Sequence, residues 1–393
     1  MSTRPPVSDW ASDFDHLDPR WIEDPYPIWE GLRSACPIAH TARYRGVYFP
    51  TRYEDVRAVA YDTEHFSSRR IIVRETPPPR IPAPPITSDP PAHRPAKNLL
   101  LPVFTPDAIK RHEPHARAIC NELIDRFAGK GGCDAAVDYA QEIPARIIAH
   151  MLGLPDDEGD RFRRWIHEVL ELGITEPAVL MRAMGETKTY FTAEIEKRRA
   201  APSGDLISYL AHAEIDGQPL SEDHLVGTLR LLLFAGIDTT WSAIGASLWH
   251  LAQHAADRRR LVDEPELIPT AVEEFLRAYA PVTMGREVVK ETSINGCPFK
   301  PGEMVLLSFP AANRDPAVFR DADRVVIDRA ENRHAAFGLG IHRCIGSNLA
   351  RMEITVALQE WLRRIPDFAL APAAVPWSEG TVRGPRKVPV RFG

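Results

Sequence analysis

The sequence lacks the features of a secreted, disulfide-stapled or nucleic-acid-binding protein. Its five cysteines are odd in number and form no C-x-x-C pair, which favours reduced thiols in a cytoplasm over a disulfide framework. The net charge is −6, so no overall basic field attracts nucleic acid or anionic lipid. The first residues, MSTRPPVSDWASDFD, carry charges where a signal peptide needs an apolar core. We therefore expect a cytoplasmic protein that binds neither nucleic acid nor membrane.

No repeat and no Gly/Ser-rich linker divides the chain, so we expect one domain over residues 1–393. Hydrophobic residues make up 44% of the sequence, enough for a large core. The most membrane-like stretch is 225–252, but Arg230 and Asp238 interrupt it. Each such charge costs about 2.5–3.5 kcal/mol at the middle of a membrane. This stretch is predicted to be a helix buried in protein.

The order of elements predicts a mainly α protein. Short β-prone runs occur at 37–42 and 46–51, and the proline-dense segment 76–85 predicts a loop. From 106 to 276 the apolar residues are spaced by three and four, which indicates a stack of helices. Further β-prone runs follow at 287–294 and 304–309, then an irregular stretch at 313–337 and a helix at 344–364. Small sheets are expected near both ends of the chain.

Residues 337–346 read FGLGIHRCIG, a glycine-rich loop that brings Cys344 to the predicted start of a helix. A helix N-terminus lowers the pKa of a thiol and favours the thiolate that iron needs as a ligand. Glycines let the backbone approach a flat cofactor closely. A phosphate-binding loop is disfavoured because the spacing is not G-x-G-x-x-G. An inert buried cysteine is the other alternative.

At every fixed position this loop resembles the cytochrome P450 signature F-G-x-G-x-H-x-C-x-G. The resemblance implies the cytochrome P450 fold, a helical bundle around haem b with small sheets. It also implies that Cys344 is the metal ligand, and that Phe337, Gly338 and Gly346 contact the haem. A thiolate ligand pushes electron density toward the iron and favours O–O cleavage.

A second motif, A-G-I-D-T-T at 235–240, resembles the family's oxygen-binding A-G-x-D-T-T. Small residues at Ala235 and Gly236 leave room beside the haem for O2. The resemblance makes Thr239 the donor of a hydrogen bond to the oxygen and Asp238 the proton relay. Taken alone, the same letters would fit a plain core helix about equally well.

Four side chains are expected to bind the haem propionates: His93, Lys97, Arg286 and His342. His93 and Lys97 are four residues apart on a short predicted helix and therefore point the same way. The family pattern is H-x-x-x-R. Lysine keeps the charge of that arginine but lacks its planar, bidentate fork.

The E-x-x-R pair Glu274 and Arg277 resembles the family's structural ion-pair network, with Arg324 as the expected third member. An acid and a base three residues apart are weak evidence by themselves, because such pairs are common on solvated helix faces. A metal site at His250 and His254 is disfavoured, because Leu251 stands where H-E-x-x-H has glutamate.

The resemblance implies a monooxygenase that takes electrons from a ferredoxin and its reductase, or from a fused FMN/2Fe–2S reductase that haem domains of this kind carry. The substrate residues expected by position in the family are Leu232, Ala235, Val282, Met284 and Thr381. This apolar set predicts hydroxylation or O-dealkylation of a small apolar, aromatic substrate. A peroxide-using enzyme and a non-catalytic haem sensor are the two alternatives.

Overall fold

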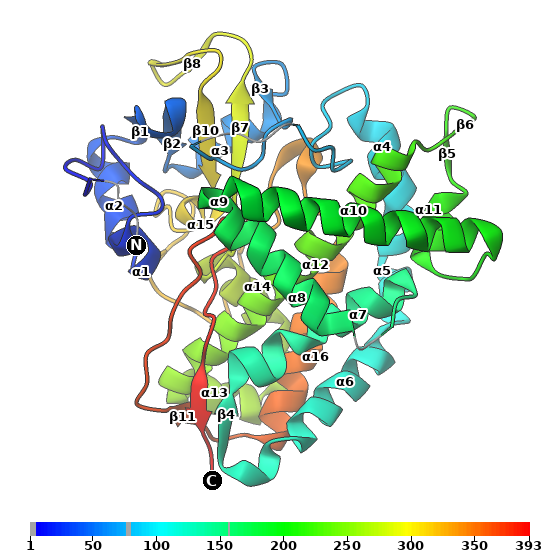
Figure 1. Ribbon diagram of the computed structural model, residues 1–393. Helices are drawn as coiled ribbons and strands as arrows, with labels where there is room; N and C mark the ends of the chain where they lie inside the picture. Colours follow the sequence, from blue (N-terminus) through cyan, green and yellow to red (C-terminus); the bar gives the residue numbers. More distant parts are fainter. Residues whose placement is uncertain (1–4, 76–79, 156–157) are drawn as a thin grey trace.

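The computed structural model describes residues 5–75, 80–155 and 158–393. The strands of its largest sheet lie at the upper end of the view, a smaller sheet lies at the lower end near the C-terminus, and helices fill most of the space between (Figure 1). The longer helices are α2 (Tyr26–Ala35), α3 (Tyr53–Tyr61), α4 (His93–Leu100), α6 (Glu113–Asp125), α7 (Glu142–Leu152), α8 (Gly159–His167), α10 (Pro177–Ala200), α12 (Glu222–Gln253), α13 (Ala255–Asp263), α14 (Ile268–Ala278) and α16 (Ser347–Arg364). The mainly α architecture predicted from the sequence is confirmed.

The main sheet has the strand order β1-β2-β10-β7-β3. Its strands are β1 (Ile38–Thr41), β2 (Val47–Pro50), β10 (Met304–Ser308), β7 (Thr283–Val288) and β3 (Phe66–Ser67). Only the pair β10 and β2 is parallel within this sheet. The β-prone run predicted at 287–294 is misplaced, because β7 begins at Thr283 and a turn separates it from β8 (Thr292–Ile294). Residues 283–286 therefore lie on a strand.

A three-stranded sheet near the C-terminus joins β11 (Ala369–Leu370), β12 (Pro389–Arg391) and β4 (Gly132–Asp134). Two hairpins pair β5 (Glu214–Ile215) with β6 (Gln218–Pro219), and β8 with β9 (Cys297–Phe299). One hydrophobic core extends from Leu100 to Val390. A single domain over residues 1–393 stays a prediction, which this shared core favours.

Helix α12 is the central helix of the bundle and packs against α7, α14 and α16. Ser221 caps its N-terminus by accepting a hydrogen bond from the backbone of His224, and acidic residues fill its first turn. Its length and apolar composition would suit a membrane span, but 78% of its most apolar window is buried inside the protein. The prediction of a helix buried in protein is confirmed.

Candidate functional site

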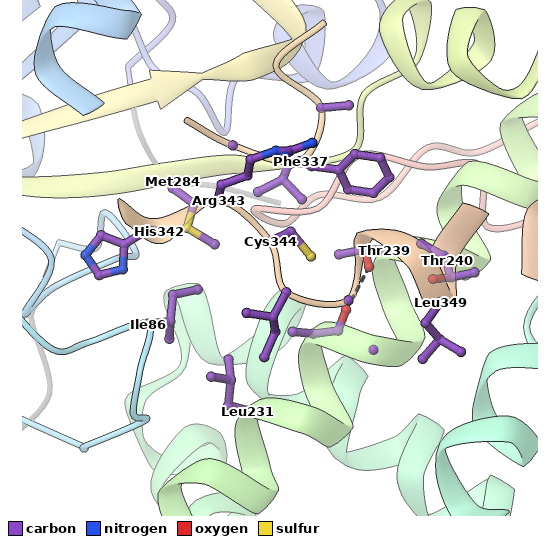
Figure 2. A pocket seen from close by; sticks show the side chains of 18 of the residues that line it. Ile86, Leu231, Thr239, Thr240, Met284, Phe337, His342, Arg343, Cys344 and Leu349 are labelled. Carbon is purple, nitrogen blue, oxygen red and sulfur yellow. Dashed lines mark hydrogen bonds between the residues drawn. The ribbon is translucent and has the colours of Figure 1, made fainter. Parts of the chain in front are cut away.

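The loop that carries Cys344 is held in place by its own backbone. Gly338 and Gly340 have φ values of 72° and 69°, which favour glycine. A Cβ on Gly340 would lie 2.3 Å from the carbonyl oxygen of Ala60 on α3. The backbone N–H of Cys344 donates to the carbonyl of Phe337 at 2.8 Å and closes the loop. This geometry aims the thiol into an interior cavity (Figure 2).

Two details of this loop correct the sequence-based expectations. Helix α16 begins at Ser347, so Cys344 lies one turn before the helix and not at its first residue. Burial raises the pKa of the Cys344 thiol, whereas we expected the helix end to lower it. The backbone N–H of Gly346 and the cations Lys97, Arg351 and Arg343 act in the opposite direction but do not outweigh burial.

Helix α12 forms the wall of the cavity across from this loop. Ala235 is exposed, yet it lines the interior cavity. The hydroxyl of Thr239 donates to the carbonyl of Ala235 at 2.7 Å (Figure 2). Gly236 lets α12 approach α7 closely, because a Cβ there would lie 2.6 Å from Cδ1 of Ile148. The structure thus brings Cys344, Ala235, Gly236 and Thr239 to one cavity, as predicted.

Asp238 does not line this cavity. Its side chain is fully buried and forms an ion pair with Arg386, with the closest N···O distance at 2.7 Å. Arg386 also bridges to Glu171 at 2.6 Å and lies 4.4 Å above the ring of Trp241. Sequence reasoning missed Arg386 because it is 148 residues from Asp238 and belongs to no motif.

The four side chains predicted to bind propionates all line the Cys344 cavity, and no aspartate or glutamate of the described ranges is among its lining residues. The rings of His93 and His342 are 4.4 Å apart. Lys97 donates to the carbonyls of Ile341 and Arg343, at 2.5 and 3.0 Å. Lys97 and Arg286 bring positive charge to this lining and the two histidines bring ring N–H donors, so the lining suits an anionic occupant.

The ionisation of these groups supports the same conclusion. Burial, together with Arg286, His93 and Lys97, lowers the pKa of His342 to about 3. Burial lowers the pKa of Arg286 to about 10. The buried Nε2 of His342 has no hydrogen-bond partner among the described residues. Carboxylates at this end of the cavity would satisfy these groups, so the lining fits a flat group with propionates and a thiolate ligand.

The predicted ion-pair network is present, but one member is wrong. Arg277 and Glu274 are fully buried and form a bidentate pair on α14, with both distances 2.8 Å. The third side chain is Arg329, whose Nε donates to Glu274 at 2.9 Å. Arg324 contributes only its backbone carbonyl, which accepts from Arg277 at 2.6 Å. Arg324 and Arg329 both lie in the irregular stretch, where the path of the backbone determines which side chain points inward.

The predicted substrate residues fall into two adjoining cavities. Leu232, Val282 and Met284 line the Cys344 cavity with Ala235. Thr381 lines a second cavity, which shares Ala235, Thr239, Val282 and Met284 with the first. This outer cavity is also lined by the loop at 69–87, except for Thr76–Pro79, which fall outside the described residues. Five arginines are among the described residues of its lining, four of them in this loop.

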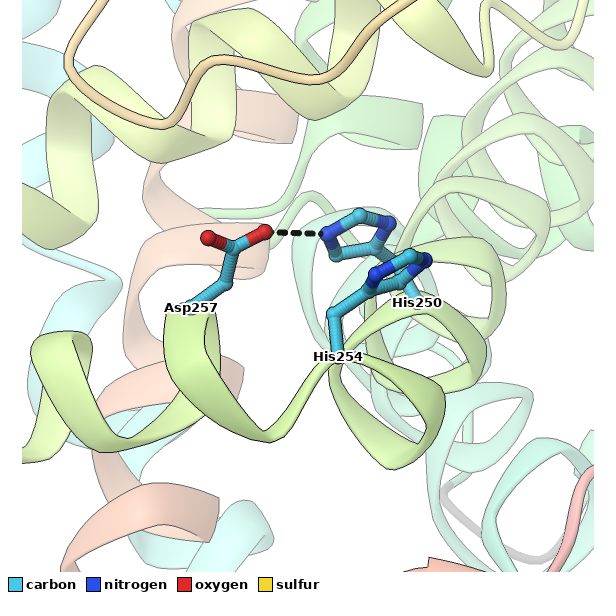
Figure 3. A group of neighbouring side chains, drawn as sticks. All are labelled: His250, His254 and Asp257. Carbon is cyan, nitrogen blue, oxygen red and sulfur yellow. Dashed lines mark hydrogen bonds and ion pairs between the residues drawn. The ribbon is translucent and has the colours of Figure 1, made fainter.

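His250 and His254 stack with ring centroids 4.1 Å apart at the junction of α12 and α13 (Figure 3). With Asp257 they could offer a metal three ligand atoms, all within 4.8 Å of one another. Both ring nitrogens of His250 already have partners, Asp257 and the hydroxyl of Tyr279, each at 2.8 Å. The cluster is explained as a hydrogen-bonded helix junction.

Comparisons with known proteins agree on one family. A family model described as Cytochrome P450 matches residues 177–365. Mycinamicin IV hydroxylase/epoxidase of Micromonospora griseorubida is 37% identical over 351 residues, which cover 86% of this chain and 88% of that protein. The solved structure of the cytochrome P450 PksS of Bacillus subtilis superposes with a TM-score of 0.89 at 30% identity, over 97% of this chain and 100% of that chain. CYP109E1 of Bacillus megaterium, solved with testosterone, gives a TM-score of 0.88 at 32% identity, over 94% and 98%.

Proposed function

The chain belongs to the cytochrome P450 family, whose members bind haem b through a cysteine thiolate, and on this premise we propose that Cys344 is the axial ligand of a monooxygenase. The observation that carries the proposal is the placement of Cys344, Thr239 and the four propionate-binding candidates around one cavity. Thiolate-bound haem supplies the reductive cleavage of O2, in which two electrons and two protons place one oxygen atom in the substrate and release the other as water.

The polypeptide orients the cofactor in this proposal. Lys97 and Arg286 would hold the propionates by charge, and His93 and His342 by hydrogen bonds, which would fix the orientation of the ring. Phe337, Gly338 and Gly346 line the cavity on the cysteine side. Below the cavity, Glu274, Arg277 and Arg329 hold the irregular stretch that leads into the Cys344 loop.

Proton delivery falls to Thr239 and Asp238. The Thr239 hydroxyl stands at the cavity wall, where it is able to exchange its bond to the Ala235 carbonyl for one to O2. Asp238 directly precedes Thr239 on α12, and its carboxylate forms an ion pair with Arg386. This acid and alcohol favour the O2 reaction over a peroxide-using one, and activity with peroxide alone against activity with reductase and O2 separates the two.

For the reaction itself we propose hydroxylation or O-dealkylation of a small apolar, aromatic substrate. The apolar side chains that line the cavity together with Thr239 support this proposal, among them Leu232, Val282 and Met284. Apolar pockets with few polar groups orient such substrates with modest selectivity. One relative is named as a mycinamicin IV hydroxylase/epoxidase, and the structure of another was solved with testosterone.

We propose that electrons reach the haem from a ferredoxin or from a fused FMN/2Fe–2S reductase, and that the protein works in the cytoplasm. The five cysteines are all free in the structure, which supports a reducing compartment. Arg343 in the cysteine loop and Arg111 at the end of α5 (Pro106–Lys110) are both exposed and would attract an acidic partner. The guanidinium of Arg351 does not add to this free charge, because it is paired with Glu273 at 2.6 and 2.9 Å. The rate of reduction by ferredoxin should fall as salt rises.

The spectrum of the reduced, CO-bound protein tests the ligand assignment. The wild type should show the strongly red-shifted Soret band of thiolate ligation, and Cys344→Ser should lose it. Cys36→Ser is the matched control and should keep the band, because Cys36 lies outside the cavity lining. A red-shifted band that survives in Cys344→Ser would contradict the assignment.

A further inference from the structure

The outer cavity is basic although most of its walls are apolar. Among the residues that the structure describes, its lining includes Arg69, Arg70, Arg74, Arg80 and Arg230 and no aspartate or glutamate. Arg69 is paired with Asp89 at 3.1 Å, outside the lining. A pocket for a neutral apolar molecule would not need such charge, because burying guanidinium groups costs free energy.

Arg74 and Arg230 are the informative members because their side chains are only 9% and 8% exposed. Among the described residues, neither forms an ion pair. Arg74 makes one hydrogen bond, from its Nη2 to the carbonyl of Val169 at 3.3 Å, and its buried Nε has no partner. Arg230 donates to the hydroxyl of Thr187 at 2.9 Å and to the carbonyl of Met184.

Two other buried arginines of this protein are paired with carboxylates. Arg277 is bonded to the carboxylate of Glu274, and Arg386 to those of Asp238 and Glu171. Burial lowers the pKa of both Arg74 and Arg230 to about 10, which records the cost of keeping them charged. An anion that entered the outer cavity would offset this cost.

The cavity that Arg74 and Arg230 line adjoins the Cys344 cavity, where we expect the reaction. Val169 and Met184, which accept hydrogen bonds from Arg74 and Arg230, both line the outer cavity. That cavity shares Ala235, Thr239, Val282 and Met284 with the Cys344 cavity. A substrate whose anionic end lies near the two guanidiniums would therefore extend its apolar body toward Thr239. The planar guanidinium fork suits a carboxylate, which accepts two parallel hydrogen bonds.

Building on the proposed function, we infer that Arg74 and Arg230 form an anion subsite, and that the natural substrate is a carboxylic acid whose apolar body reaches the Cys344 cavity. The subsite anchors the carboxylate at the wall of the outer cavity that Arg74 and Arg230 line. It thereby selects which carbon of the apolar body is presented for oxidation.

Binding of matched ligand pairs to the haem-loaded protein tests this inference. The pairs are 4-hexylbenzoate with 4-hexylbenzyl alcohol, and decanoate with decan-1-ol, measured by calorimetry and by the shift of the haem spectrum. We expect the wild type to bind each acid at least about tenfold more tightly than its alcohol, as charge-assisted hydrogen bonds provide. Equal affinities for acid and alcohol would overturn the subsite.

Arg74→Met and Arg230→Met should each lose most of this preference while keeping the affinity for the alcohols. Arg199→Gln is the matched control, an exposed arginine on α10 outside the cavity, and should keep the preference. A preference that persists in both methionine variants overturns the inference. Tighter binding of decyl sulfate than of decanoate overturns the assignment to a carboxylate.

Thermal unfolding gives a second readout that does not need turnover. Arg74→Met removes an uncompensated buried charge, so the ligand-free variant should melt at the wild-type temperature or above. Saturating 4-hexylbenzoate should raise the melting temperature of the wild type more than that of Arg74→Met. An equal rise in both proteins counts against the subsite. A failure of the proposed function would have a different signature. The reduced, CO-bound protein would then lack the thiolate band, whether or not the acids bind more tightly than the alcohols.

Discussion

The carboxylate of Asp238 and the guanidinium of Arg386 form an ion pair inside the protein, one residue away from Thr239. Arg386 holds Asp238 and Glu171 at once, and so connects α12 to the π-helical segment Glu168–Leu172 and to the C-terminal stretch. Because Asp238 is fully buried, its position depends on this single cation. The pair therefore bears on both stability and proton delivery.

Arg386→Met should be strongly destabilising, because it leaves the fully buried Asp238 without its cation and leaves Glu171, among the described residues, with only His167, at 3.6 Å. Breaking a buried pair in this way costs about 3–5 kcal/mol. Asp238→Asn should cost less, since Arg386 keeps Glu171, but it should slow the whole catalytic cycle by removing the acid. Urea unfolding of the haem-loaded proteins and turnover rates measure the two effects. Arg386→Met with the stability of wild type would show that the pair contributes nothing.

Lys97→Glu should weaken haem retention, because it places a negative charge beside the propionates. Lys97→Arg should retain haem as the wild type does, since it keeps the positive charge. Arg94→Glu on the same helix is the control, because Arg94 is exposed and does not line the cavity. Haem content after gel filtration is the measurement. Equal haem content in Lys97→Glu and Arg94→Glu would contradict the contact.

Glu353 predicts a pH dependence of stability. It is fully buried on α16, neither carboxyl oxygen has a hydrogen-bond partner among the described residues, and burial raises its pKa well above the usual 4.5. The folded protein therefore binds this proton more tightly than the unfolded chain. The associated stability is full below pH 4.5 and is lost as pH rises from there toward the folded pKa, by up to about 1.4 kcal/mol per pH unit.

Glu353→Gln should consequently raise the melting temperature more at pH 8 than at pH 5, because glutamine has no proton to lose. Glu331→Gln, at an exposed position, is the control and should show no such difference. Melting curves of the four protein and pH combinations, with wild type alongside, make the comparison. A stabilisation by Glu353→Gln that is equal at both pH values would show that the carboxyl finds a partner.

What the sequence could predict was local. The loop around Cys344 and the motif around Thr239 each fit within about ten residues, so their letters indicate their geometry without knowledge of the fold. Arg386 and Arg74 could not be found in this way, because their importance comes from burial beside distant partners. The sequence predicted Arg324 as the third member of the ion-pair network, but the side chain of Arg329 takes that place. Both residues lie in an irregular stretch, which has no periodicity to indicate which side chains point inward.

Thr239→Ala tests the mechanism more sharply than any change of ligand. The methyl side chain should leave the haem, the thiolate spectrum and the cavity intact, because the hydroxyl now bonds only to the carbonyl of Ala235 on its own helix. Removing a positioned donor of this kind costs about 3–4 kcal/mol by analogy with oxyanion holes. O2 that takes up two electrons and two protons without this donor should leave as hydrogen peroxide, so the variant should oxidise NAD(P)H but yield peroxide in place of much of the product. Product formed per NAD(P)H oxidised, with peroxide quantified in parallel, is the measurement.

Thr239→Ser is the control and should stay coupled because it keeps the hydroxyl. If Thr239→Ala couples as tightly as Thr239→Ser, the hydroxyl only caps a turn of α12, and proton delivery must follow another route.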